Sequence, residues 1–366
     1  MPLIALDARK YHDFGIGTYI QHLLGEFRSL PQAPDFHLFL AAQDAETITV
    51  PERWKTSVSA HRKYSVGEFA FFGREINARN VALFHSPHYT LPFGLKCPSV
   101  VTIHDLIHLR FPQYFSVLQR SYSYGMILYA INRAKFIITD SEFTKRDILS
   151  SFRVTEDKII TIHLGVAEQF CQPVSRETSD EFRKEFRLPR PYILFVGNTK
   201  PHKGIEVLLR AFGKVAGAFP DVDLVFVGGD PQSNTAFSAV IRASNLSKRI
   251  ISLGWLSTAA LHDAYQEAEM FVLPSSYEGF GLPVLEAMAS GTPVVASDAG
   301  SLPEVAGDAA ILCKSGNYGM FADAMVNILR DRNLRNTMIQ NGIKHASKFS
   351  WKSTAQKTLE VYERTM

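Results

Sequence analysis

Two glutamates frame a short polar segment in the second half of the chain: Glu278 and Glu286, with seven residues between them. Carboxylates accept hydrogen bonds from the hydroxyl groups of a ligand. The backbone between the two glutamates can approach a ligand closely where it is glycine, and a helix that starts there favours negative charge. Such a segment indicates a ligand that carries both hydroxyl groups and phosphate. The amides concerned belong to Gly279, Phe280, Gly281 and Leu282.

The elements around this pair predict a strand, a loop, a helix and a second strand. Residues 271–274 form a short apolar run of the kind buried in a parallel sheet, and residues 275–282 form a polar loop. Pro283 suits the first helical position, and Gly291 can take the left-handed cap before the next strand. A straight helix would separate the glutamates by about 12 Å, whereas the loop lets both face the carboxyl end of the sheet. In the simpler alternative, the two charges only offset the helix dipole.

A basic segment follows another predicted strand, residues 192–196. It carries Lys200, His202 and Lys203 just before a predicted helix, where cations suit a phosphate group. A pair of solvated lysines is the simpler alternative.

Two further strand ends in the first half of the chain carry residues of interest. His104 directly follows a predicted strand over residues 99–103 and could belong to a binding site. A histidine at the end of a strand more commonly has a structural role as a hydrogen-bonding residue. Gly15 and Gly17 precede an expected helix over residues 18–27, although two glycines can equally form a simple turn. We predict no metal site, because the spacing of the histidines is loose and no set of carboxylates completes it. The histidines that would form it are His85, His88, His104 and His108.

The segment YEGFGLPVLEAMASGTPVV, which contains both glutamates, resembles the signature of the retaining nucleotide-sugar glycosyltransferases of family 4, also called group 1. The segment VVTIHDLIHLRFP, which contains His104, is similar to bacterial mannosyltransferases of polysaccharide and O-antigen assembly. The resemblance implies the GT-B fold, with two facing Rossmann-like α/β domains and an active site in the cleft between them. It implies that Glu278 and His104 contact the transferred sugar as catalytic residues, and that Glu286 holds the ribose.

The same resemblance implies the rest of a donor site. Lys203 matches a lysine that binds the donor diphosphate, but Asn198 stands where the family usually has an arginine. Either Lys200 or His202 supplies the missing charge, or the diphosphate is held less strongly. Two turns lie beside the nucleotide, and the loop before the first long helix closes over the donor phosphates or the acceptor. These segments contain Gly229, Leu253, Gly15 and Gly17.

The length of 366 residues suits two domains. We expect an N-terminal Rossmann-like domain on the acceptor side at 1–172, a nucleotide-sugar domain at 173–349, and a final helix at 350–366 that crosses back. Strand-like runs separated by helical patterns support two doubly wound sheets. These runs are 3–6, 37–41, 81–85, 99–103, 136–139 and 159–162, then 192–196, 224–227, 250–253, 271–273, 294–296 and 310–312.

Composition limits the location and the partners. A net charge of +3 gives no case for nucleic-acid binding, and Cys97, Cys171 and Cys313 lack metal-ligand spacing, so they predict free thiols in a reducing cytosol. The chain opens directly into a strand, without the pattern of a signal peptide, and no apolar run is long enough to span a membrane. Residues 53–79 mix six basic and two acidic residues with aromatic residues. This segment suits peripheral contact with the inner face of the membrane or a lipid-linked acceptor, or else it is a solvated helix.

Together these observations predict a cytoplasmic retaining glycosyltransferase that moves a hexosyl unit to a saccharide or lipid-linked saccharide. Mannosyl from GDP-mannose is the preferred donor, and we expect neither a cofactor nor an obligatory metal. Two alternatives stay open: a nucleotide-sugar epimerase or hydrolase of the same architecture, and a non-catalytic sugar-binding subunit. A dehydrogenase is disfavoured because no strand is followed by GxGxxG with an acidic residue about 20 positions later.

Overall fold

The computed structural model describes residues 2–243 and 246–366, and these residues form two units. The N-terminal unit runs to Gly165 and includes Trp351–Met366, and the C-terminal unit is Val166–Ser350. Residues 166–172, which we assigned to the first domain, therefore belong to the second. The reason is packing: the buried ring of Phe170 lies edge-on to the rings of His262 and Tyr265.

A parallel sheet of seven strands forms the centre of the described N-terminal unit, in the order β3-β2-β1-β4-β5-β6-β7. All six predicted strands are confirmed to within two residues. One edge strand, β3, was missed because three of its four side chains are polar and the strand is mostly exposed. The strands are β1 Leu3–Asp7, β2 Asp35–Leu40, β3 Lys55–Val58, β4 Leu83–Ser86, β5 Ser99–Ile103, β6 Phe136–Thr139 and β7 Ile159–Thr161.

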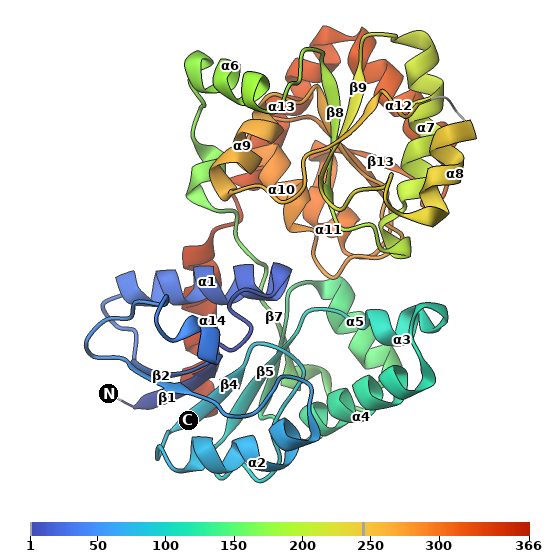
Figure 1. Ribbon diagram of the computed structural model, residues 1–366. Helices are drawn as coiled ribbons and strands as arrows, with labels where there is room; N and C mark the ends of the chain where they lie inside the picture. Colours follow the sequence, from blue (N-terminus) through green and yellow to red (C-terminus); the bar gives the residue numbers. More distant parts are fainter. Residues whose placement is uncertain (1, 244–245) are drawn as a thin grey trace. The chain divides into compact units, whose positions relative to one another are not determined.

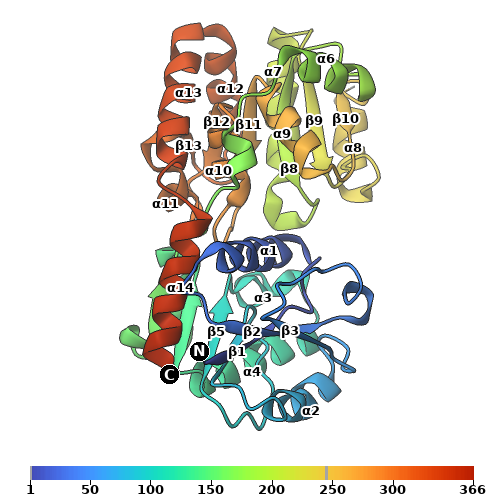
Figure 2. The ribbon, with the colours of Figure 1, turned by 90° about the vertical axis from the view of Figure 1, so that its left-hand side faces the viewer.

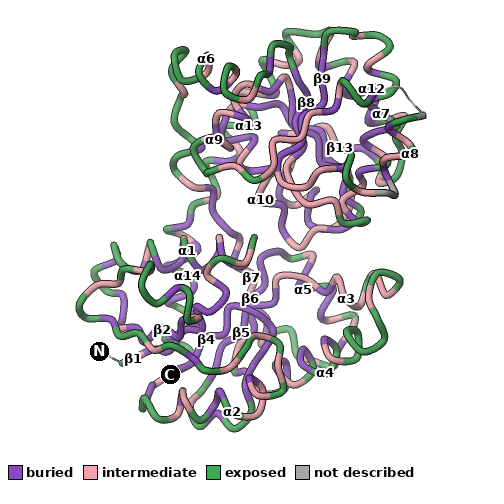
Figure 3. Tube along the Cα trace, viewed as in Figure 1, coloured by how far each residue is buried: buried purple, intermediate pink, exposed green. Residues whose placement is uncertain are grey.

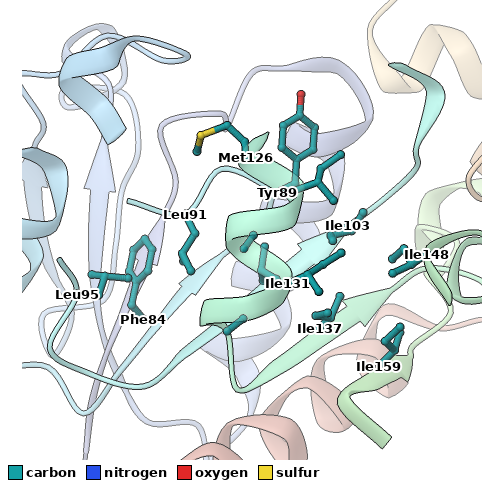
Figure 4. Packing of buried hydrophobic residues seen from close by; sticks show 14 of the residues in the cluster. Phe84, Tyr89, Leu91, Leu95, Ile103, Met126, Ile131, Ile137, Ile148 and Ile159 are labelled. Atoms are coloured by element: carbon teal, nitrogen blue, oxygen red, sulfur yellow. The ribbon is translucent and has the colours of Figure 1, made fainter. Parts of the chain in front are cut away.

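Helices cover both faces of this sheet (Figure 1). The final helix, α14, packs beside α1, as Figures 1 and 2 both show. It is anchored by Tyr362, whose hydroxyl lies 2.6 Å from Nδ1 of His85 on β4. Under α4, apolar side chains from β4, β5, β6 and the loop before β5 form a continuous core (Figure 4). The helices are α1 Phe14–Ser29, α2 Val66–Asn77, α3 Ile107–Arg110, α4 Val117–Arg133, α5 Glu142–Ser151 and α14 Trp351–Thr365.

The C-terminal unit repeats the plan with six parallel strands among its described residues, in the order β10-β9-β8-β11-β12-β13. These strands are β8 Tyr192–Gly197, β9 Asp223–Gly228, β10 Ile250–Ser252, β11 Met270–Leu273, β12 Val294–Ser297 and β13 Ile311–Cys313. All six were predicted. The helices are α6 Arg176–Glu185, α7 Ile205–Ala218, α8 Thr235–Ala243, α9 Thr258–Gln266, α10 Leu282–Ala289, α11 Leu302–Ala306, α12 Tyr318–Arg330 and α13 Arg332–Ala346.

The strands are buried along most of their length, and the exposed residues lie on the outer faces of the helices and in loops (Figure 3). The strand order reverses direction between β1 and β4 in one sheet and between β8 and β11 in the other. In sheets of this kind, ligands bind beyond the carboxyl ends of the strands at such a reversal. The α/β class with two Rossmann-like domains is confirmed, whereas an active site between the domains stays a prediction.

Candidate active site

The loops that follow β8 and β11 meet through an ion pair between Lys203 and Glu278. The Lys203 Nζ donates to Glu278 Oε1 at 2.7 Å, and the Ser275 hydroxyl donates to the same oxygen at 2.6 Å. Both charged side chains are largely buried, at 16% and 13% exposure. Lys203 lies in a short 3-10 turn, Pro201–Lys203, before α7. The structure therefore places two separately predicted residues in direct contact, at the point where the strand order reverses.

Backbone packing fixes the position of Glu278. Gly300 has a φ of +64°, and a Cβ there would lie 2.6 Å from the Glu278 carbonyl oxygen. The Ser301 hydroxyl donates to the carbonyl oxygens of Glu278 at 3.0 Å and Phe280 at 2.6 Å. Only glycine allows so close an approach in this backbone conformation. The loop that carries the carboxylate is therefore held from behind by the segment after β12.

The Lys203 segment is fastened to β11 in the same way. Gly204 has a φ of +70°, and a Cβ there would lie 2.1 Å from the Pro274 carbonyl oxygen. The Ser276 amide donates to the His202 carbonyl oxygen at 2.7 Å. Because these contacts join two loops at the backbone, Lys203 and Glu278 are positioned by the fold as well as by their mutual attraction.

Glu286 lies one turn into α10, which begins at Leu282 after Gly281 with a φ of +103°. The buried Tyr265 hydroxyl donates to Glu286 Oε2 at 3.0 Å. Burial raises the pKa of Glu286 to about 7, against a smaller lowering by the hydrogen bond from Tyr265. This carboxyl group therefore changes its charge near neutral pH.

The basic side chains near Asn198 differ in what they can contribute. Burial and the neighbouring Lys203 lower the pKa of His202 to about 4, so its ring is neutral at neutral pH. In the ligand-free protein Lys200 and Lys203 are therefore the better sources of the missing arginine charge, and a role for His202 beside a bound diphosphate stays a prediction. Lys200 is exposed, and its backbone amide donates to the Asn198 side chain at 3.1 Å. Lys203 and Lys200 remain as the cations of this segment.

The turns predicted to lie beside the nucleotide pack closely on the loop after β8. A Cβ on Gly229 would lie 2.8 Å from the Thr199 amide nitrogen. The Leu253 amide donates to the Phe226 carbonyl oxygen at 2.9 Å, which extends the pairing of β9 with β10. Gly229 and Leu253 thus lie at the carboxyl ends of strands in the same sheet as Lys203, whereas a role in base or ribose binding stays a prediction.

His104 belongs to the N-terminal unit, just after β5. Its Nδ1 lies 2.6 Å from Oδ2 of Asp140, which follows β6, and its Nε2 lies 3.0 Å from the Pro87 carbonyl oxygen. The ring also packs edge-on to Tyr19 of α1, with centroids 5.2 Å apart. His104 is therefore a fixed, hydrogen-bonded side chain at the carboxyl edge of its sheet.

The prediction of a glycine loop before the first helix was wrong. Helix α1 begins at Phe14, so Gly15 and Gly17 lie in its first turn. The Gly17 amide donates to the Asp13 carbonyl oxygen at 2.6 Å, and a Cβ at Gly17 would lie 2.4 Å from the Tyr11 carbonyl oxygen. Gly17 is thus needed for packing against the preceding loop, whereas a Cβ on Gly15 would meet no atom within 4 Å.

Two of the four histidines that could be drawn as a metal cluster have a hydrogen-bond partner at each ring nitrogen. His85 binds Tyr362 and Thr102, and His104 binds Asp140 and Pro87. Within residues 2–243 and 246–366, no group of three or more histidine, cysteine or acidic side chains is arranged to hold a metal ion.

Three residues that contact predicted site residues within their own units were missed in the sequence. Tyr265 lies in a helix with an ordinary amphipathic pattern, and Ser301 follows a glycine in a polar turn, so neither position is distinctive. Asp140 directly follows a predicted strand, and this placement at the edge of the sheet is the one signal that could have indicated it.

Two family models match the chain. The model described as glycosyl transferases group 1 matches residues 177–345, and the model described as glycosyltransferase family 4 matches residues 15–170. A curated relative, the O-antigen chain mannosyltransferase B of Escherichia coli, is 27% identical, over 99% of this chain and 99% of its own.

Solved structures share the fold. Sucrose-phosphate synthase from Thermosynechococcus elongatus aligns with a TM-score of 0.80 at 22% identity, over 100% of this chain and 99% of that one. Anabaena HepE in complex with UDP-glucose aligns with a TM-score of 0.79 at 17% identity, over 100% of both chains. At these identities the likeness concerns the fold alone.

Proposed function

Because this chain belongs to the group 1 glycosyltransferases of family 4 and has their GT-B fold, we propose that it transfers a hexosyl unit from a nucleotide diphosphate sugar to a saccharide or lipid-linked saccharide. The ion pair between Lys203 and Glu278 at the carboxyl end of the second sheet carries this proposal. An ammonium group there can bind the diphosphate, and the neighbouring carboxylate can accept hydrogen bonds from sugar hydroxyls.

In the proposed reaction, the bond between the anomeric carbon and the phosphate oxygen breaks, and the acceptor oxygen bonds to the same carbon. The acceptor proton passes to the donor phosphate, and the new bond lies on the face that the phosphate leaves, so configuration is retained. Negative charge grows on the diphosphate as it departs. In this proposal Lys203 and the amide groups at the start of α10 stabilise that charge, and one such donor is typically worth a few kcal/mol.

This arrangement supplies positive charge from the protein itself, and we propose that neither a cofactor nor a divalent cation is required. For the sugar, we propose mannose carried by GDP, supported by the resemblance of the His104 segment and by the O-antigen mannosyltransferase relative.

Thermal unfolding with added nucleotides tests the donor. We expect GDP and GDP-mannose to raise the unfolding temperature selectively, because a ligand at 100 times its dissociation constant adds about 2.7 kcal/mol to the free energy of unfolding. The same measurement with UDP, ADP, dTDP and their sugar conjugates serves as the comparison. Each nucleotide is measured once with EDTA and once with Mg²⁺. A selective response to UDP or ADP would keep the fold and reject mannose from GDP. A response that needs Mg²⁺ would contradict metal-independent binding, and free sugar released without an acceptor would favour a hydrolase.

We also propose that the segment over residues 53–79 touches an anionic lipid surface. On α2, Val66 is 81% exposed and Phe71 46%, and Phe93 in the nearby loop is 58% exposed. Exposed arginines, Arg62 and Arg74, lie on the same segment. No helix among the described residues is long and apolar enough to cross a membrane.

Sedimentation with lipid vesicles tests this contact. We expect the protein to bind vesicles that contain anionic lipid and to lose roughly thirtyfold in affinity when Arg62 and Arg74 are replaced by glutamine, since each basic residue contributes about 1 kcal/mol at such a surface. The control replaces Arg332 and Lys344 in the C-terminal unit by glutamine, which removes the same number of positive charges. Equal binding to neutral and anionic vesicles would contradict the proposal.

A further inference from the structure

Both ring nitrogens of His104 face oxygen atoms that accept hydrogen bonds. Nδ1 faces Asp140 Oδ2 at 2.6 Å, and Nε2 faces the Pro87 carbonyl oxygen at 3.0 Å. A carbonyl oxygen can only accept, and so can an ionised carboxylate. A neutral imidazole has a single N–H group, so one of its nitrogens would place a lone pair against an oxygen. The imidazolium form satisfies both contacts by donating from each nitrogen.

The carboxylate of Asp140 needs a compensating charge. Its side chain is 3% exposed, and its second oxygen, Oδ1, is buried and has no hydrogen-bond partner among the described residues. An ionised carboxylate buried with half of its hydrogen bonds unmade is costly unless a cation lies beside it. His104, at 16% exposure, is the residue in contact with it. The geometry of the pair thus favours a carboxylate and an imidazolium.

The other titratable groups around His104 do not supply this charge. Burial lowers the pKa of His85 to about 3 and the pKa of His88 well below its ordinary value, so both rings are neutral at neutral pH. Asp105, the next residue, adds negative charge. The titratable groups that face His104 from the strands, loops and helix around it are Tyr19, His85, His88, Asp105 and Asp140.

We propose that Asp140 is a positioning residue that holds His104 as an imidazolium, so that His104 serves the transfer reaction as a hydrogen-bond donor rather than as a general base. This inference rests on the proposed function. The substrate atom that His104 contacts must then be an oxygen that accepts a hydrogen bond, such as a sugar hydroxyl or a phosphate oxygen. The donor to that atom is the Nε2–H group, which also faces the Pro87 carbonyl oxygen. Asp140 fixes both the protonation state and the orientation of the ring.

The pKa of His104 agrees with this geometry. Burial alone would lower the pKa, but the Asp140 carboxylate and then the Pro87 carbonyl raise it above the ordinary histidine value. Because the pKa is raised in the folded protein, the stabilising charge is fully present below the pKa of the unfolded chain. It is lost as the pH rises through the folded value. Activity that depends on the imidazolium should therefore fall on the alkaline side.

The test replaces Asp140 by asparagine, which keeps an acceptor for Nδ1 but removes the charge. We expect the alkaline limb of the kcat profile to move to lower pH by about one unit or more, so that turnover falls about tenfold at pH 8 and little at pH 6. Asp147→Asn is the matched control, because Asp147 is a buried carboxylate of the same unit that pairs with Arg110. It should leave the profile in place.

Nitrogen NMR of the histidine rings in the ligand-free protein tests the charge without any substrate. The His104 signal, identified by its loss in His104→Gln, should show two protonated nitrogens at pH 7 in the natural protein and titrate at lower pH in Asp140→Asn. A neutral His104 ring at pH 7 in the natural protein would overturn the proposal whether or not the donor is GDP-mannose. An equal loss of turnover at every pH in Asp140→Asn would assign Asp140 a purely structural role and overturn it as well.

Discussion

Replacing Glu278 by glutamine is expected to lower kcat about 100- to 1000-fold, which corresponds to about 3–4 kcal/mol in the transition state. Glutamine fills the same volume and can still accept from Ser275 and Lys203, so the loop keeps its hydrogen bonds. The substitution removes the negative charge that, in the proposed reaction, interacts with the transferred sugar. We expect the free energy of unfolding to fall by only roughly 1–2 kcal/mol, since Lys203 loses its counter-charge and Ser275 donates to a neutral amide in place of a carboxylate.

The control for this substitution is Glu206→Gln on α7, where the carboxylate is 53% exposed and pairs with Arg210. It should change neither turnover nor stability measurably. Combining Glu278→Gln with Lys203→Met separates the two roles, because residues in direct contact give non-additive losses. Unchanged turnover in Glu278→Gln would remove this pair from the reaction, and strictly additive losses would show that the two residues act independently of each other.

The sheets of both units could be predicted from the sequence because most of their strand residues are apolar and buried. Runs such as Tyr192–Gly197 are apolar along their whole length and end at glycine or polar residues. The exception, Lys55–Val58, lies at an edge of the sheet, where three of its four side chains are polar and it lacks a run of apolar residues. The fold could therefore be predicted wherever a strand is buried and its residues form an apolar run in the sequence.

The candidate site was predicted in part. Lys203 and Glu278 lie 75 positions apart, and each was identified by its place after a strand. Their contact follows from β8 and β11 being neighbours, which the strand runs alone do not reveal. The start of α1 was misplaced because Gly15 and Gly17 suggested a loop, whereas Asp13 already caps the helix at its carbonyl. Side-chain partners such as Asp140 and Tyr265 depend on tertiary contacts that no local pattern encodes.

The Glu286 carboxyl group is expected to make the protein less stable as the pH rises from about 5 to 8. Its pKa is raised from 4.5 to about 7 in the folded chain, so between these values the folded state binds more protons than the unfolded state. The free energy of unfolding therefore falls over this range, by about 3 kcal/mol for this one group. Glu286→Gln removes the titration, so urea unfolding at pH 5 and pH 8 should show the variant gaining about that much relative to the natural protein.

The same titration should govern donor binding. If the ribose hydroxyls donate to Glu286, they favour its ionised form, and the donor must release the proton that Glu286 holds below pH 7. The dissociation constant of the donor should therefore increase about tenfold for each pH unit below about 6.5 in the natural protein and stay flat in Glu286→Gln. Calorimetry in buffers of different ionisation heat would also detect the proton released on binding. A pH-independent dissociation constant in the natural protein would place the ribose elsewhere and leave Glu286 a buried acid bound to Tyr265.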